Sequence, residues 1–164
     1  MAEDKLKEIA KLKANYEDYR KKYGLPSYKE LNEEFEIEKL TEVEGTELFM
    51  RKMRRVMIDK IIYLLRFLES FLNPQNAPMF ILVILKNLKE GTGKVVEKLY
   101  KEGCDLEIKA LTLDVSSTEK QEAELIKEII KRWNSMRKEI EDLYKEVARA
   151  WEASEKKELK SYLG

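Results

Sequence analysis

The densest group of side chains able to bind phosphate lies at residues 51–55, which read Arg-Lys-Met-Arg-Arg. Lysine and arginine neutralise the phosphate oxygens of nucleic acids. The candidate phosphate contacts on DNA or RNA are therefore Arg51, Lys52, Arg54 and Arg55. The competing interpretation is a solvated helix face with local ion pairs, because Glu47 lies four residues before the first arginine and Asp59 four after the last. We favour the ion-paired face and keep nucleic-acid binding as the alternative.

A second candidate for phosphate chemistry is Gly-Thr-Gly-Lys at residues 91–94, since phosphate-binding loops use glycine amides and a lysine. The full motif needs glycine where Leu88 stands, serine or threonine where Val95 stands, and a preceding strand. We interpret this segment as a turn that ends a helix.

Metal and acid-base chemistry find little support in the composition. The chain contains no histidine, so the commonest general base and the imidazole metal ligand are both absent. The glutamates of residues 30–47 can in principle hold a hard cation, but they lack the spacing of a calcium loop. We predict no cofactor, no metal and no catalytic residue, and we favour a non-catalytic protein over an enzyme.

The strongest pattern is a heptad register in the last third of the chain, in which apolar residues recur at alternating spacings of three and four, as in a coiled-coil seam. Its members are Ile126, Ile129, Trp133, Met136, Ile140, Leu143, Val147 and Ala150. Along this helix we select Trp133, Met136, Ile140 and Trp151 as candidate contacts with a protein partner or a second copy of the chain. Packing inside the chain's own bundle is the competing interpretation.

The helices that position these side chains can be predicted from the spacing of apolar residues, starting at the N-terminus. It predicts an N-terminal helix over residues 3–23, with Gly24 as its stop. Ser27 and Glu30 form a capping box that starts a shorter helix.

A core helical hairpin is predicted over residues 47–90, after Gly45 and Thr46 and with its turn at residues 73–78. The run 78–85 is apolar nearly all round, so we place it at the centre of the bundle.

The remaining chain is predicted to be helical, and the helix assignment is ambiguous at two places. Gly103 is predicted to interrupt a helix, and residues 104–115 alternate like a strand but also fit a helix, which we favour because no second strand is evident. A long helix is predicted over residues 118–162, with a break or frayed end beyond Ala153 and Ser154.

The amino-acid composition indicates which kinds of partner and which cellular compartment to expect. The chain has 164 residues, and its 32 basic and 32 acidic side chains cancel, which removes any long-range field toward nucleic acid or membranes. A single cysteine and the lack of a signal segment indicate a cytoplasmic protein. The Glu- and Lys-rich composition is typical of a thermophilic archaeon, and AT-rich codon usage is the alternative source of the same bias.

We therefore predict a single all-α domain over residues 1–164, an irregular antiparallel bundle of about five to seven helices with a long C-terminal heptad-patterned helix. The favoured function is a protein-protein interaction adaptor or subunit of a larger assembly. The alternative is a nucleic-acid-associated accessory protein.

Overall fold

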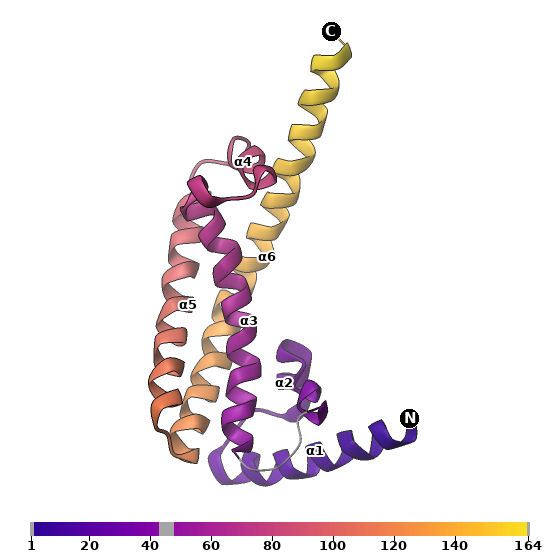
Figure 1. Ribbon diagram of the computed structural model, residues 1–164, viewed down its shortest axis with the longest axis vertical. Coiled ribbons are helices and arrows are strands. Elements are labelled where there is room, and N and C mark those ends of the chain that lie inside the picture. Colours follow the sequence, from indigo (N-terminus) through magenta and orange to yellow (C-terminus); the bar gives the residue numbers. More distant parts are fainter. Residues whose placement is uncertain (1, 43–47, 164) are drawn as a thin grey trace. The chain divides into compact units, whose positions relative to one another are not determined.

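The computed structural model describes residues 2–42 and 48–163, and within them all regular secondary structure is helical (Figure 1). Six α-helices are joined by turns and two short 3-10 helices, which confirms the predicted all-α class. Their bounds are α1 (Ala2–Tyr23), α2 (Tyr28–Phe35), η1 (Ile37–Glu42), α3 (Phe49–Leu72), η2 (Pro74–Asn76), α4 (Met79–Leu85), α5 (Thr92–Val115) and α6 (Glu119–Leu163). The predicted cap at Gly45 and Thr46 lies outside the described residues.

The chain divides into two compact units. Unit 1 comprises Met1–Ile62 and Leu106–Arg132, and unit 2 comprises Tyr63–Asp105 and Trp133–Gly164. The helices α3, α5 and α6 each contribute one segment to both units. A single domain over the whole chain stays a prediction.

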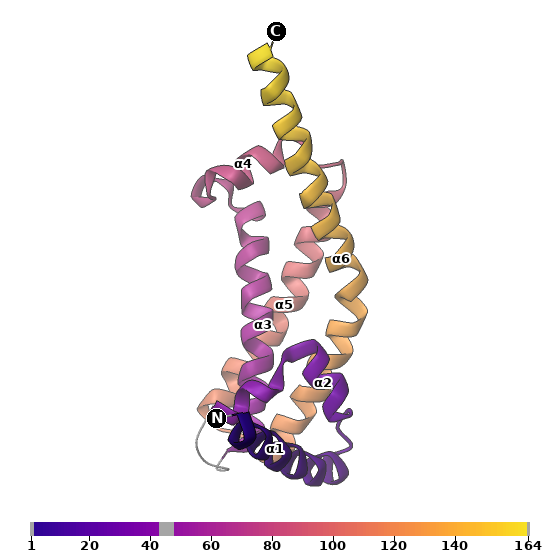
Figure 2. The same cartoon turned by 90° about the vertical axis from the view of Figure 1, so that its right-hand side faces the viewer.

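In unit 1, α1 lies across the first turns of α3 and α6 (Figures 1 and 2). Gly24 ends α1 as predicted, because its φ of +66° is a left-handed conformation that side chains disfavour. Tyr16, fully buried, donates a 2.6 Å hydrogen bond from its hydroxyl to the carbonyl oxygen of Pro26. Tyr19 stacks on Phe49 of α3 with ring centroids 5.2 Å apart.

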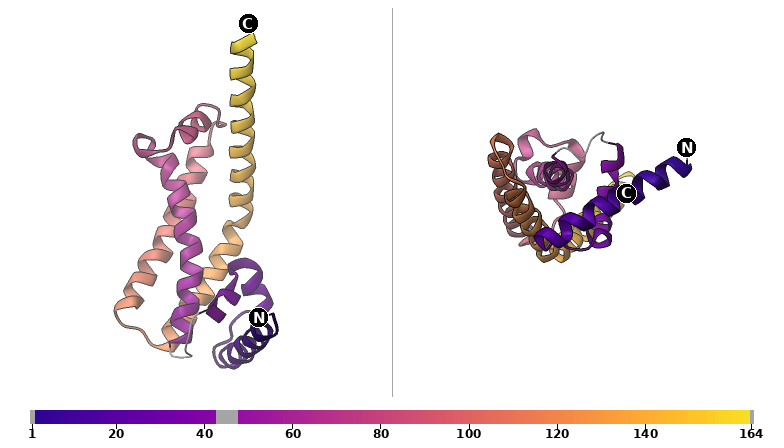
Figure 3. Two further views of the ribbon diagram at one scale, coloured as in Figure 1. Left: turned by 45° about the vertical axis from the view of Figure 1, so that its right-hand side comes forward. Right: turned by 90° about the horizontal axis from the view of Figure 1, so that it is seen from below.

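The α2 helix and η1 fold back beside α3 within the same unit (Figure 3). Ser27 caps α2 as predicted, since its hydroxyl oxygen accepts a 3.2 Å hydrogen bond from the Glu30 amide. On α3, the Lys60 ammonium lies 5.6 Å from the Phe35 ring centroid. Leu31 and Ile37 are buried, so this short segment belongs to the core of unit 1.

In unit 2, the apolar run that was predicted to form the bundle centre is instead the two-turn helix α4, which covers the ends of α3 and α5 (Figures 1 and 3). Only Ile81 and Ile84 of α4 are buried, while Met79 and Phe80 are exposed. The prediction was wrong because a helix of 7 residues spans only about 10 Å, too little to run the length of a bundle. The α3 half of the predicted hairpin is a core helix, with Leu64 and Leu68 buried.

The helix prediction for residues 104–115 is confirmed, because α5 runs without a break from Thr92 to Val115. Gly103 therefore does not interrupt it; its cost of about 1 kcal/mol in a helix interior is small beside the burial of Leu99 and Leu106 on the same helix. The helix α6 is likewise continuous to Leu163, so the break predicted after Ala153 is absent from the described backbone.

Candidate functional site

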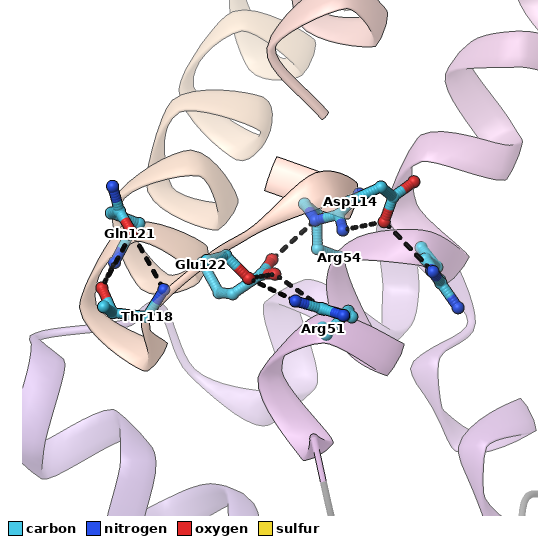
Figure 4. Close-up of polar contacts among 8 residues, drawn as sticks. Arg51, Arg54, Asp114, Thr118, Gln121 and Glu122 are labelled. Atoms are coloured by element: carbon cyan, nitrogen blue, oxygen red, sulfur yellow. Dashed lines mark hydrogen bonds and ion pairs between the residues drawn. The ribbon is translucent and has the colours of Figure 1, made fainter. Parts of the chain in front are cut away.

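The basic cluster of α3 turns inward in unit 1 (Figure 4). The Arg54 side chain is only 1% exposed. Its Nε lies 2.6 Å from a carboxylate oxygen of Glu122, and its Nη2 lies 2.6 Å from Oδ1 of Asp114. Glu122 is itself only 3% exposed, so the two buried charges of opposite sign neutralise each other inside the unit.

The neighbouring arginines join the same network. Arg51 donates hydrogen bonds to Glu122 at 3.4 Å and to Ser117 at 2.8 Å, and the exposed Arg55 pairs with Asp114 at 3.2 Å. The hydrogen bond from Arg54 is the main reason that the pKa of Asp114 lies below its ordinary value. These acids come from the end of α5 and the start of α6 and not from Asp59; Glu47 lies outside the described residues.

Three of the four predicted phosphate contacts are thus ion-paired within unit 1, and Lys52 is half-buried. Sequence reasoning missed Glu122, although a signal existed. Four residues before Ile126, Glu122 continues the spacing of the heptad seam toward the N-terminus of α6. A glutamate at such an inward position requires a buried cation opposite it.

The start of α6 aligns this network. Thr118 and Gln121 form a reciprocal capping box, in which the Thr118 amide donates to the Gln121 side-chain oxygen at 2.9 Å and the Gln121 amide donates to the Thr118 hydroxyl at 3.3 Å (Figure 4). Ser117 donates a 2.6 Å hydrogen bond to Glu122. The predicted helix start therefore also orients the buried carboxylate.

The predicted protein-contact residues fall into two groups in unit 2. Trp133, Met136 and Ile140 are buried among the chain's own side chains. Trp151 is 40% exposed. These three seam residues are therefore covered by this chain, whereas Trp151, at the edge of the seam, faces water.

Trp151 continues an exposed aromatic stripe. Tyr144 precedes it by one heptad on α6 and is 43% exposed. The Tyr144 ring packs edge-on against Phe67 of α3, with centroids 5.4 Å apart, and Tyr63, one turn before Phe67, is 74% exposed. We call Tyr63, Phe67, Tyr144 and Trp151 the aromatic surface of unit 2.

The pKa of Tyr144 lies above its ordinary value, first because the phenol is partly buried and second because Tyr63 is nearby. The Tyr144 hydroxyl therefore stays protonated at neutral pH, and this ring adds no charge to the aromatic surface.

The Gly-Thr-Gly-Lys segment starts a helix and does not end one as was predicted, because α4 stops at Leu85 and Thr92, Gly93 and Lys94 form the first turn of α5. Gly91 has a φ of +87°, and α5 begins at Thr92. The shallow pocket beside it, of about 530 Å³, is lined by four acidic and three basic side chains, so it offers no excess of positive charge to a phosphate. Within the described part of the chain, no group of three histidine, cysteine or acidic side chains is arranged to hold a metal ion.

No helix within the described residues is long and apolar enough to cross a bilayer.

Comparison with known proteins adds no functional assignment, because no family model, curated protein or solved structure matches this chain.

Proposed function

We propose that this chain is a non-catalytic interaction protein that associates with a second copy of itself through the aromatic surface of unit 2. The observation that carries the proposal is that Tyr144 and Trp151 stay exposed on α6 while Trp133, Met136 and Ile140 are buried. Tyrosine and tryptophan bury large apolar areas at low entropic cost, and they dominate the binding energy of protein interfaces.

The spacing of the exposed residues suits a partner helix. Tyr144, Ala148 and Trp151 stand at positions i, i+4 and i+7 of α6, on one side of the helix, and Ala148 is exposed between the two rings. A small residue between two aromatic side chains lets a second helix approach closely.

The charges around the aromatic surface favour a second copy as the occupant. On α3 the exposed Arg66 and Glu69 follow Tyr63, and on α6 the exposed Arg137 pairs with Glu141 at 3.1 Å just before Tyr144. Both signs are equally represented along this rim, so it attracts no partner of a single charge sign. The net charge of zero also removes long-range repulsion between identical chains.

The proposal is tested by sedimentation equilibrium of the full chain over a range of protein concentrations. We expect a mass twice that of the 19.5 kDa chain, with an apolar contact that persists at moderate salt. Tyr144→Ala or Trp151→Ala should weaken the dimer by about tenfold or more, as expected for central aromatic contacts.

Leu111→Ser is the matched control, because Leu111 is an exposed apolar residue of unit 1. It should leave the dimer unchanged. A monomer at every concentration, or equal weakening by Leu111→Ser and Trp151→Ala, would overturn the proposal.

Nucleic-acid binding by the basic cluster stays the alternative hypothesis, and the internal ion pairs of Arg51 and Arg54 weaken it. Binding of a DNA or RNA oligonucleotide at low salt that is lost in the Arg55→Ala variant would support it. Arg55 is the suitable position because its side chain is exposed.

We also infer the cellular compartment of the protein and the kind of organism that it comes from. The single cysteine, Cys104, supports a reducing cytoplasm, and the abundance of glutamate and lysine supports a thermophilic archaeal source. A melting temperature above about 90 °C would agree with a thermophilic origin.

A further inference from the structure

Unit 1 contains a groove between α5 and α6 with a volume of about 980 Å³. Its α5 wall includes Lys109 and Thr112, and its α6 wall extends from Lys120 to Arg132. At 1.5 Å per residue this α6 wall is about 18 Å long, which corresponds to three turns of a helix lying in the groove. We call it the α5–α6 groove.

The groove is cationic although the chain as a whole is neutral. Five basic side chains and two acidic ones, Glu124 and Glu128, line it. The basic side chains are Lys109, Lys120, Lys127, Lys131 and Arg132. This local excess of positive charge favours an acidic ligand.

Both carboxylates of the groove are already engaged. Glu128 accepts hydrogen bonds from Lys109 at 2.7 Å and from Arg132 at 2.6 Å, and Glu124 accepts one from Lys127 at 2.7 Å. The hydrogen bond from Lys109 is the main reason that the pKa of Glu128 lies below its ordinary value, so this acid stays charged at neutral pH. Lys120 and Lys131 are exposed and make no ion pair within the described part of the chain.

Apolar side chains form the floor between these walls. Leu125 of α6 is 5% exposed, and Leu113 of α5 is half-buried. A ligand that fits must therefore present an apolar ridge between acidic flanks, which is the pattern of an amphipathic helix.

A bare polyanion fits these features less well. The apolar floor offers nothing to a phosphate backbone, and three of the five cations already share Glu124 or Glu128. The cations left for a ligand are Lys120 and Lys131, which stand eleven residues apart on α6 and so flank a bound helix near both of its ends.

We propose that the α5–α6 groove is a second docking site, which takes an acidic amphipathic helix of another protein. This site is separate from the aromatic surface of unit 2. Together they would make the chain a self-associating adaptor that presents one helix-binding groove on each copy.

The test uses the full chain and a fluorescent synthetic peptide of about 14 residues, with leucines spaced three and four apart and glutamates on the flanks. Binding is followed by fluorescence anisotropy, and helix formation by the bound peptide is followed by circular dichroism. We expect the peptide to bind and gain helicity, while a scrambled peptide of the same composition binds at least about tenfold more weakly.

The double variant Lys120→Glu with Lys131→Glu should weaken peptide binding by about tenfold or more, because it replaces two attractive contacts with two repulsive ones. Lys94→Glu with Lys138→Glu is the matched control, since both lysines are exposed in unit 2 and the change in net charge is the same. That control should bind the peptide as the unchanged chain does. Tyr144→Ala should also leave peptide binding unchanged, which separates this proposal from self-association.

Three results would overturn the proposal. Equal binding of the scrambled peptide would show that the groove does not read a helix. Equal weakening by the control pair would show that only overall charge matters. Tighter binding of a single-stranded DNA oligonucleotide, lost in the Lys120→Glu and Lys131→Glu variant, would identify a polyanion site instead.

Discussion

Units 1 and 2 are built from segments of the same three long helices, yet they differ in what they bury and what they expose. Unit 1 buries charge, with Arg54 and Glu122 paired inside it. Unit 2 buries aliphatic residues such as Leu68 and Leu99, and it leaves the rings of Tyr144 and Trp151 in water.

The comparison shows that the type of a residue in this chain does not by itself reveal whether the residue binds a partner or stabilises the fold. The arginines of residues 51–55 read as a surface for phosphate, but the structure uses Arg51 and Arg54 to join α3 to α6. The heptad seam reads as an interface, but the structure covers Trp133 with its own chain. The aromatic surface of unit 2 and the α5–α6 groove of unit 1 are therefore the better candidates for binding.

The largest expected effect comes from breaking the buried charge pair of unit 1. Glu122→Ala should lower the free energy of unfolding by about 3–5 kcal/mol, because it removes one of the two partners of the buried Arg54 guanidinium. Chemical denaturation followed by circular dichroism measures this loss. Arg55→Ala is the control, and its exposed ion pair should cost less than about 1 kcal/mol. Equal losses in the two variants would contradict a buried structural pair.

The second effect tests the seam in unit 2. Ile140→Ala should cost about 2–5 kcal/mol, because truncating a buried isoleucine removes apolar contacts and leaves a cavity. The loss should be the same at low and high protein concentration, since the Ile140 contacts lie within one chain. A loss that vanishes on dilution would place Ile140 at an interface between copies.

A smaller effect on stability is expected when the pH is lowered, through the Glu146 carboxylate of unit 2. Hydrogen bonds, first of all from Arg149, lower the pKa of Glu146 from 4.5 to about 2. Because the folded-state pKa lies below the ordinary value, the charged carboxylate stabilises the fold above about pH 4.5, and this contribution is lost as the pH falls toward 2. Glu146→Gln should cost about 1 kcal/mol at neutral pH, the scale of one net hydrogen bond.

Unfolding experiments at a series of pH values check this prediction. The difference between the unchanged chain and Glu146→Gln should shrink as the pH falls from 4.5 to about 2. A difference that does not depend on pH would mean that the Glu146 charge does not contribute to stability.

Local signals explain how much of the fold was predictable. Gly24 and the capping pairs Ser27–Glu30 and Thr118–Gln121 act within a few residues, so the end of α1 and the starts of α2 and α6 follow from the sequence. The position of α4 did not follow, because an apolar run shows that side chains avoid water without showing which neighbours cover them.

Long-range pairing explains why the sites were only partly predicted. Arg54 and Glu122 are 68 residues apart in sequence, and no spacing rule connects them. The α5–α6 groove likewise depends on how Lys109 of one helix meets the helix that carries Lys131. Trp151 was identified in advance because it stands at the edge of the heptad seam, and its exposure required the structure.

The two tryptophans allow the most direct test of self-association through Trp151. Trp133→Phe leaves Trp151 as the only fluorescent tryptophan, and Trp151→Phe leaves Trp133. We predict that acrylamide quenches Trp151 strongly in dilute protein and weakly in concentrated protein, while Trp133 stays protected at every concentration. Quenching of Trp133 that increases on dilution, with no change at Trp151, would contradict this account and place the interface at the heptad seam.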